Sequence, residues 1–324
     1  MLGVFLDLES LDRGDLDLQP LHAALPQWHM HAATQPADVA ARIRDAGVVI
    51  SNKVVLDSRT LQSAGALELV CIAATGTNNI DLDAAGERGL TVCNVAGYAT
   101  RSVVEYVFAQ LLSLYRQLPA YHADIKSGKW QRAEHFCLLD HPIGELHGQT
   151  LGIIGYGELG RAVADMGRAF GMRVLVAERA NAPLRSGRRP LGTVLAESHV
   201  VSLHCPLTPD TRNLIGREEL DAMREDAVLV STARGGIVDE TALLQALQSG
   251  RIAAAVVDVH ENEPPRDGNP LLDATLPNLL VTPHIAWASR TSRQHLVNEL
   301  AENIAAWRRG TPRNVVGTRD RSHT

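Results

Sequence analysis

An α/β fold with two parallel-sheet domains is predicted by three features of the sequence. The chain has 324 residues, which is enough for about two domains of roughly 100–200 residues each. Short apolar runs alternate with helical patterns, as is typical of a parallel sheet with helices on both faces. In the second part of the chain the runs consist almost entirely of Val, Ile, Leu and Ala, as expected for doubly wound strands buried on both sides.

The first hundred residues contain four candidate strands with helical segments between them. We expect a helix at 36–45 and strands at 3–6, 48–50, 69–73 and 90–93. The next helix, at 102–117, is apolar over most of its surface, so we interpret it as a bridge between the two domains. Ser102 stands three residues before Glu105, and this spacing predicts a capping box with Ser102 as the N-cap.

The second part begins with an apolar strand at 151–154 that leads into a glycine loop. Helical patterns are clearest at 166–170, 218–223 and 241–248, and they separate further strands that we expect at 174–177, 199–204, 227–231, 253–259 and 279–282. The last helix is predicted at 291–308, because Leu296, Leu300 and Ile304 recur there at helical spacing.

Composition excludes several classes of partner. The net charge is −6, and no long run of like charge occurs, which argues against a nucleic-acid or anionic-membrane surface. No stretch reaches the ~18 consecutive apolar residues of a membrane span. Asp7 and Glu9 interrupt the apolar start, so it is interpreted as a strand and not as a signal peptide. We therefore expect a cytoplasmic protein with no metal site and with reduced, scattered cysteines at Cys71, Cys93, Cys137 and Cys205.

The glycine loop has the pattern of a dinucleotide-binding site. Gly155, Gly157 and Gly160 form G-x-G-x-x-G between an apolar strand and a helical pattern, which allows a tight turn and a close approach to a pyrophosphate. Glu178 ends the next strand, eighteen residues after Gly160, where an acid can accept hydrogen bonds from ribose hydroxyls and repel a 2′-phosphate. These features favour NAD over NADP, whereas Arg179 beside the acid is a residue that could meet such a phosphate.

Each apolar strand of the second part is followed by a distinctive polar or turn residue. In open α/β sheets, ligands bind outside the carboxyl ends of the strands, so we expect these residues to line one crevice. In chain order they are Gly155, Glu178, His204 with Cys205 and Pro206, Thr232 with Ala233 and Arg234, Asp258, and Pro283 with His284.

Two of these residues suit a small carboxylate substrate. Arg234 is always charged, and its planar fork matches a carboxylate with two parallel hydrogen bonds. His284 is a natural proton donor to a forming alkoxide, because imidazole titrates near neutral pH. A carboxylate bonded to His284 would fix its tautomer and favour its protonated form, and spacing alone leaves both Glu261 and Glu263 as candidates.

Five further stretches occur in a fixed order along nearly the whole chain. They are A-T-G-T-N-N-I-D at 74–81, H-C-P-L-T-P-D-T-R-N-L-I-G at 204–216, T-A-R-G-G-I-V-D-E at 232–240, D-V-H-E-N-E-P at 258–264 and T-P-H-I-A-W at 282–287. Together with the glycine loop and Glu178, they resemble the D-isomer-specific 2-hydroxyacid dehydrogenase family. Within that family, residues 130–143 resemble the glycerate dehydrogenase, or hydroxypyruvate reductase, branch.

The resemblance implies a catalytic set of Arg234, Glu263 and His284. Arg234 would hold the substrate carboxylate, His284 would be the acid/base, and Glu263 would be its partner. The resemblance favours Glu263 over Glu261, because the family's glutamate directly precedes a proline.

The resemblance also implies the binding residues. Asp258 would orient the nicotinamide carboxamide, and the substrate would meet Thr75, Gly76, Thr77 and Arg234. For the cofactor we expect contacts from Gly155, Tyr156, Gly157, Glu158, Leu159, Gly160, Glu178, His204, Cys205, Pro206, Thr211, Thr232, Ala233, Arg234, Asp258, His284 and Ala286.

The resemblance implies a flavodoxin-like substrate domain of residues 1–101 and 288–324 and a Rossmann NAD-binding domain of residues 102–287. It also implies an active site in the cleft between the two domains and a homodimer as the assembly.

The sequence departs from the family pattern at three positions, none of them a catalytic group. Ser231 stands where many members have asparagine, His260 where an aromatic residue is common, and Glu178 where aspartate is commoner.

We therefore expect an NAD(H)-dependent oxidoreductase that interconverts a small 2-keto acid and its D-2-hydroxy acid, with hydroxypyruvate or glyoxylate as the best candidates. One alternative is a formate or phosphite dehydrogenase on the same scaffold. A second is a non-enzymatic NAD-sensing module, against which the retention of Arg234, Glu263 and His284 argues. The sequence leaves open which acid is used and in which direction the reaction runs.

Overall fold

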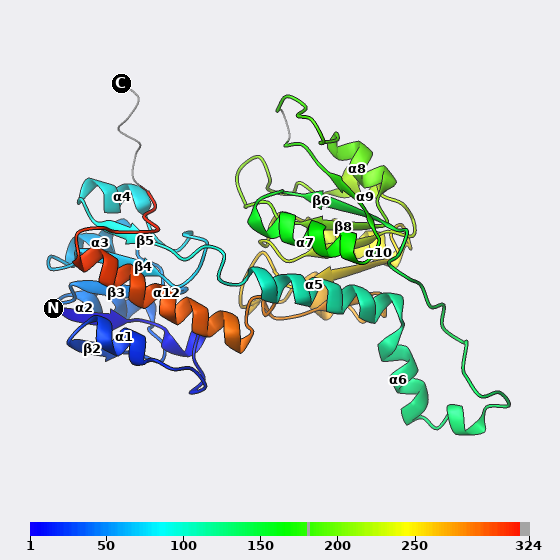
Figure 1. The fold of residues 1–324 in the computed structure, drawn as a ribbon, viewed down its shortest axis with the longest axis horizontal. Helices are drawn as coiled ribbons and strands as arrows, with labels where there is room; N and C mark the ends of the chain where they lie inside the picture. The colour runs from blue at the N-terminus through cyan, green and yellow to red at the C-terminus, as the bar shows by residue number, and fades with distance from the viewer. Residues whose placement is uncertain (180–181, 318–324) are drawn as a thin grey trace. The chain divides into compact units, whose positions relative to one another are not determined.

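The computed structural model describes residues 1–179 and 182–317, in which the chain forms two compact units (Figure 1). Unit 1 combines Met1–Ala99 with the segment that starts at Ala288, and unit 2 consists of Thr100–Trp287. Each unit is built on a parallel sheet with helices, which confirms the predicted fold class. Within the described residues, no helix has both the length and the apolar character needed to cross a membrane.

Unit 1 contains a five-stranded sheet in the order β2-β1-β3-β4-β5, and every neighbouring pair is parallel. This order is the flavodoxin-like one. The strands are β1 (Leu2–Phe5), β2 (Gln27–Met30), β3 (Val48–Ser51), β4 (Leu69–Ile72) and β5 (Thr91–Cys93). The helices are α1 (Gln19–Ala24), α2 (Val39–Ile43), α3 (Ser58–Ser63), α4 (Leu82–Glu87) and α12 (Arg290–Arg308), with 3-10 turns η1 (Leu8–Ser10) and η2 (Pro36–Asp38).

The core of unit 1 forms because its central strands carry apolar side chains on both faces. Val4, Val49 and Val70, from three neighbouring strands, lie in one buried cluster, and α2 and α3 cover it with Ile43 and Leu61. The edge strand β2 has a different pattern, since its side chains alternate between exposed and half-buried.

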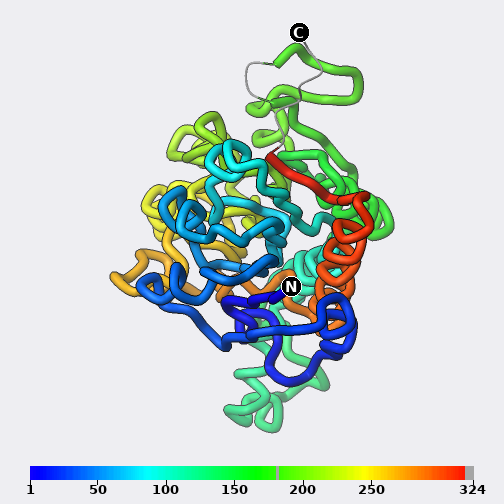
Figure 2. Tube along the Cα trace, turned by 90° about the vertical axis from the view of Figure 1, so that its left-hand side faces the viewer, coloured from blue at the N-terminus to red at the C-terminus, as the bar shows by residue number. Residues whose placement is uncertain are grey.

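Helix α12 brings the distant end of the chain back to unit 1. Its buried face includes Leu296, Leu300 and Ile304, the residues whose spacing predicted the helix. The helix packs against α1 and β4, and Figure 2 shows its orange-to-red turns beside the blue start of the chain. Unit 1 is therefore closed by a segment almost 300 residues away in sequence.

Unit 2 contains a six-stranded sheet in the order β11-β10-β9-β8-β6-β7, again with every neighbouring pair parallel. The strands are β6 (Thr150–Ile154), β7 (Arg173–Val176), β8 (Val200–Leu203), β9 (Val228–Ser231), β10 (Ala254–Val257) and β11 (Leu279–Val281). The helices are α5 (Thr100–Tyr115), α6 (Leu118–Lys126), α7 (Glu158–Ala169), α8 (Leu191–Glu197), α9 (Arg217–Ala222), α10 (Glu240–Gln248) and α11 (Pro270–Asp273), with a 3-10 turn η3 (Trp130–Arg132).

An isolated bridge extends this sheet beyond β7. Ala177 pairs in parallel with Arg189, and the N–H of Glu178 donates to the Arg189 carbonyl at 2.8 Å. The chain at Arg189 therefore occupies the place of a third strand, reduced to a single residue. When the strands of unit 2 are numbered from one, starting at β6 and counting the bridge at Arg189 as the third strand, their order in the sheet is 3-2-1-4-5-6-7. This is the 3-2-1-4-5-6 order of a Rossmann fold with one added strand.

The predicted capping box at Ser102 is wrong. Helix α5 begins at Thr100, so Ser102 lies inside the first turn and not at the cap. Its buried hydroxyl donates to the carbonyl of Ala286 at 2.7 Å, because a serine inside a helix can turn its side chain to a neighbouring segment. Ser102 therefore attaches the helix to the loop that follows β11.

Candidate active site

The carboxyl ends of the unit 2 strands lie along one edge of the sheet, because all six strands are parallel. The predicted functional residues follow those ends. They are 155–160 after β6, Glu178 after β7, 204–206 after β8, 232–234 after β9, Asp258 after β10 and His284 after β11. The strand order reverses between β6 and β8, and dinucleotides bind at such a switch point in open α/β sheets.

The loop between β6 and α7 has the geometry that its glycines predicted. Gly155 has a φ of +91°, which L side chains rarely adopt. A Cβ at Gly160 would lie 2.0 Å from the Gly155 carbonyl oxygen, so no larger residue fits there. A Cβ at Gly157 would meet no described atom within 4 Å. Gly157 is also the N-cap of α7, with no side-chain cap, so the first turn directs its N–H groups at this open space.

Glu178 is buried at the end of β7, and its carboxylate is fully engaged. Arg185 donates to it from Nε at 2.9 Å and from Nη2 at 2.5 Å, and the backbone N–H of Arg179 donates at 2.9 Å. The Arg185 guanidinium, together with the Arg179 N–H, lowers the pKa of Glu178 to about 2. The predicted ribose acceptor is therefore an anion held in place by an arginine from the following loop.

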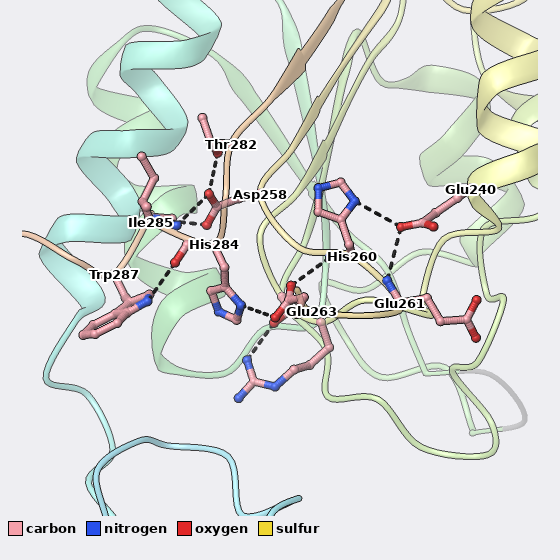
Figure 3. Close-up of polar contacts among 12 residues, drawn as sticks. Glu240, Asp258, His260, Glu261, Glu263, Thr282, His284, Ile285 and Trp287 are labelled. Atoms are coloured by element: carbon pink, nitrogen blue, oxygen red, sulfur yellow. Dashed lines mark hydrogen bonds and ion pairs between the residues drawn. The ribbon is translucent and has the colours of Figure 1, made fainter. Parts of the chain in front are cut away.

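His284 and Glu263 form a close imidazole–carboxylate pair (Figure 3). His284 Nδ1 lies 2.6 Å from Glu263 Oε2, and the other carboxylate oxygen accepts the backbone N–H of His260 at 2.8 Å. The second candidate carboxylate is directed elsewhere, since Glu261 pairs with Arg212 at 3.0 Å. The geometry thus selects Glu263 as the partner of His284, the choice that sequence spacing alone left open.

Asp258 holds the loop that carries His284. It is completely buried, and its carboxylate accepts the N–H groups of Ile285 at 2.9 Å and Ala286 at 2.8 Å, as well as the Thr282 hydroxyl. His284 has a φ of +55°, an uncommon conformation for a residue with a side chain. The hydrogen bonds on both sides of the histidine stabilise this conformation and fix the direction of its ring.

Arg234 lies in the turn after β9 and is half-buried. Its Nη1 donates to the carbonyl of Ala233 at 2.7 Å. The turn packs directly on the loop after β10, because a Cβ at Gly235 would lie 1.8 Å from the His260 carbonyl oxygen. The glycine after the arginine is therefore required by contact between two protein segments.

The segment after β8 closes over the glycine loop. The backbone of His204 and Cys205 lies against Gly155, where an added Cβ would meet it at 2.5 Å. Burial lowers the pKa of His204 to about 4, and its Nε2 lies 2.9 Å from the Ser202 hydroxyl. Thr211 donates to the Pro206 carbonyl at 2.6 Å, which ties the following turn to this segment.

The predicted substrate loop lies in unit 1, after β4. The Thr75 hydroxyl donates to the Val95 carbonyl at 2.9 Å, and Asn94 Nδ2 donates to the Thr75 carbonyl at 2.7 Å. The N–H of Ile80 donates to the Thr77 carbonyl at 3.2 Å, which closes the far end of the loop. Thr75, Gly76 and Thr77 therefore follow the carboxyl end of a central strand in their own sheet.

These groups together can bind a small carboxylate and move a proton. A guanidinium, an imidazole with a carboxylate partner and a dinucleotide-type loop all follow strand ends at the same edge of the unit 2 sheet. Across the described ranges, no group of three or more His, Cys, Asp and Glu side chains is arranged to hold a metal ion. The arrangement is that of a nicotinamide-dependent oxidoreductase.

Comparison with known families agrees with this arrangement. Residues 108–286 match the family described as "D-isomer specific 2-hydroxyacid dehydrogenase, NAD binding domain". The chain belongs to the D-isomer-specific 2-hydroxyacid dehydrogenase family. As a member of this family, it is an oxidoreductase that acts on the CH–OH group of 2-hydroxy acids with a nicotinamide cofactor.

Similar proteins match nearly the whole length of the chain. Glycerate dehydrogenase from Methylorubrum extorquens is 43% identical over 97% of this chain and 98% of that protein. Hydroxypyruvate reductase from Blautia hydrogenotrophica is 34% identical over 97% of this chain and 98% of that protein. The structure of D-lactate dehydrogenase from Aquifex aeolicus, complexed with NAD and lactic acid, is 26% identical, has a TM-score of 0.83, and covers 99% of this chain and 100% of that one.

The residues of this dehydrogenase fit a dinucleotide. Packing within the protein explains the glycine at 160, whereas no described atom requires one at 157, so a ligand that approaches the backbone closely accounts for Gly157.

Two parts of the site were not predicted from the sequence. The first is Arg185, whose charge in the loop after Glu178 was the only feature that could have indicated its contact with that carboxylate. The second is the Tyr106 hydroxyl, which lies 2.5 Å from the Thr282 hydroxyl and which no motif indicated.

Proposed function

We propose that this protein reduces a small 2-keto acid to the D-2-hydroxy acid with NADH, and that hydroxypyruvate or glyoxylate is the substrate. The observation that carries the proposal is the 2.6 Å contact between His284 and Glu263, on loops that follow the same sheet edge as Arg234 and the dinucleotide loop. Residues 1–101 with 288–324 would form the substrate domain, and residues 102–287 the NAD-binding domain.

The reduced nicotinamide supplies a hydride to C2 of the keto acid. The guanidinium of Arg234 binds the substrate carboxylate with two parallel hydrogen bonds and sets the orientation of C2. We also propose that the N–H groups of the loop at Thr75, Gly76 and Thr77 bind the substrate.

His284 gives a proton to the substrate oxygen as negative charge develops on it. Because Nδ1 donates to Glu263, Nε2 is the ring nitrogen that we assign to this proton transfer. The Glu263 carboxylate fixes the tautomer and stabilises the imidazolium form, which also stabilises the developing alkoxide. In the oxidation direction, neutral His284 accepts the proton from the hydroxyl.

We propose NAD as the preferred cofactor. The pyrophosphate would lie against Gly157 at the N-terminus of α7, and Glu178 would repel a 2′-phosphate. Asp258 would orient the nicotinamide carboxamide through the loop that it holds. Arg185 is the group that opposes this preference, since a guanidinium released from Glu178 would attract the extra phosphate of NADP.

We also propose a cytoplasmic homodimer. The free cysteines suit a reducing compartment. The segment from α6 to about residue 143 extends away from the sheet of unit 2 and exposes large apolar side chains at Trp130, Phe136 and Leu139. Exposed apolar surface of this kind marks a protein interface, and a second copy of the chain is the partner that we assign to it. Light scattering should give a mass of about twice the 35.0 kDa of one chain, and a monomer at micromolar concentration would contradict the proposal.

A substrate screen tests the proposed function. Loss of NADH absorbance should be fastest with hydroxypyruvate or glyoxylate, slower with pyruvate, and about tenfold or more slower with NADPH in place of NADH, as expected when a carboxylate faces a phosphate. Reduction of NAD by formate or phosphite, with no turnover of keto acids, would overturn the substrate assignment. Cofactor binding without turnover of any acid would indicate a sensing module instead.

A further inference from the structure

A second carboxylate–imidazole pair lies beside the Glu263–His284 pair in unit 2 (Figure 3). Glu240 Oε1 is 3.2 Å from His260 Nδ1, and the same oxygen accepts the backbone N–H of Glu261 at 3.2 Å. The other oxygen accepts Asn269 Nδ2 at 2.8 Å. Glu240 thereby joins the start of α10, the loop after β10 and the N-cap of α11.

This pair is shielded from solvent. The exposed fraction of the side chain is 13% for Glu240 and 4% for His260. Burial raises the pKa of the Glu240 carboxyl, but the hydrogen bonds from His260, Glu261 and Asn269 outweigh burial, and the pKa lies below its ordinary value. Glu240 is thus a buried anion whose stability depends on three donors from two other segments.

Glu240 is not the N-cap of its own helix. Asp239 caps α10 by accepting the N–H of Ala242 at 2.9 Å, so the side chain of Glu240 is left to reach the neighbouring loop. A carboxylate at the first helical position is also favoured by the helix dipole. The backbone of Glu240 is therefore held in place by the first turn of α10, and its side chain extends from this fixed position.

The two pairs are joined by one short segment. The backbone N–H of His260 donates to Glu263 Oε1 at 2.8 Å, and Glu263 Oε2 meets His284. The turn that carries Arg234 packs against the His260 carbonyl through Gly235. A shift of the His260 backbone would therefore move Glu263, the partner of His284, and would also displace the turn that carries Arg234.

We infer that Glu240 and His260 are positioning residues. They hold the loop after β10 so that Glu263 contacts His284 and the Arg234 turn keeps its position relative to both residues. The inference rests on the proposed function, in which these three groups act on the substrate. In this chain the loop is anchored by a polar side chain, because His260 Nδ1 contacts Glu240 Oε1.

The test compares three variants and a control by steady-state kinetics with NADH and hydroxypyruvate. Glu240→Ala removes every acceptor, and kcat should fall roughly tenfold or more because small displacements in an active site have large effects on rate, while the KM for NADH stays within about twofold. Glu240→Gln keeps an acceptor for Glu261 and should recover most of kcat. His260→Phe keeps the ring without the donor and should reproduce part of the loss.

Asp15→Asn is the matched control, because it breaks the ion pair with Arg293 within unit 1 and touches none of this network. It should lower the melting temperature and leave kcat unchanged. Glu240→Ala with a lowered melting temperature but a wild-type kcat, as in the control, would overturn the inference and leave the proposed function intact.

A second readout is independent of turnover. A proton shared between imidazole and carboxylate gives a strongly downfield NMR signal, which His284→Gln would assign in 15N-histidine-labelled protein. Glu240→Ala should move this signal upfield or broaden it, and an unchanged signal would contradict the positioning role. If the wild type reduces no keto acid, the proposed function fails, and the NMR result still decides whether Glu240 controls the Glu263–His284 contact.

Discussion

Replacing Gly157 by alanine should leave the fold intact and weaken cofactor binding. The backbone at Gly157 has φ −74° and ψ −160°, which alanine adopts without strain, and the added Cβ would meet no described atom within 4 Å. The methyl group would instead occupy the space that we assign to the pyrophosphate. A loss of about 1.4–2.7 kcal/mol corresponds to a roughly tenfold to hundredfold higher Kd for NADH.

The assay is a fluorescence titration with NADH, with the melting temperature measured on the same samples. Two alanine variants serve as controls. Gly160→Ala places a Cβ 2.0 Å from the Gly155 carbonyl oxygen and should lower both stability and affinity. Gly192→Ala, exposed in α8 with no described atom nearby, should keep the Kd and stabilise the helix by up to about 1 kcal/mol. A wild-type Kd in Gly157→Ala would refute the assignment of this loop to the pyrophosphate.

Three further outcomes follow from the same geometry. Arg234→Ala should lower kcat/KM for every keto acid by at least about thirtyfold, the equivalent of about 2 kcal/mol for a lost charge pair, and unchanged kinetics would exclude carboxylate binding by this residue. Glu263→Gln should lower kcat about tenfold or more with little change in the Kd of NADH, because the imidazolium loses its counter-charge, and a wild-type kcat would contradict that role. Arg185 lowers the Glu178 pKa from 4.5 to about 2, so the pair should stabilise the fold fully above about pH 4.5 and lose this contribution as the pH falls through about 2. The difference in melting temperature between wild type and Arg185→Ala, measured across this range, should disappear at the acid end, and a constant difference would count against the ion pair.

Most of the fold was predictable because parallel strands buried on both faces have a plain apolar signature. The strands at 200–203, 228–231 and 254–257 were expected within a few residues for this reason. The strand β2 was missed, since Q-W-H-M at a sheet edge is half-exposed and has no such signature. The bridge at Arg189 was also outside the reach of pattern reasoning, because a single paired residue has no periodicity.

The candidate site was predictable where a residue directly follows a strand. Arg234, Asp258 and His284 could be found in this way, since strand ends in a parallel sheet meet at one edge. Contacts between loops were not predictable. Glu178 with Arg185 and Glu240 with His260 depend on how each loop folds back, and loop geometry leaves no regular pattern in the sequence.

The choice between Glu261 and Glu263 shows the same limit. The two carboxylates are two residues apart, and both follow β10 at a distance that suits a histidine partner. Spacing does not decide which one meets the imidazole, although the resemblance to the family favoured Glu263, which directly precedes a proline. Glu263 does so, whereas Glu261 is directed to Arg212.

The proposed function depends on proton transfer from His284 to the oxygen of a 2-keto acid during reduction by NADH. The most direct measurement is kcat for NADH oxidation with hydroxypyruvate in wild type and in His284→Gln, together with the Kd of NADH in both. The kcat of His284→Gln should be lower than that of the wild type by roughly a hundredfold to ten-thousandfold, with an unchanged Kd for NADH. A variant that keeps the wild-type kcat would contradict it.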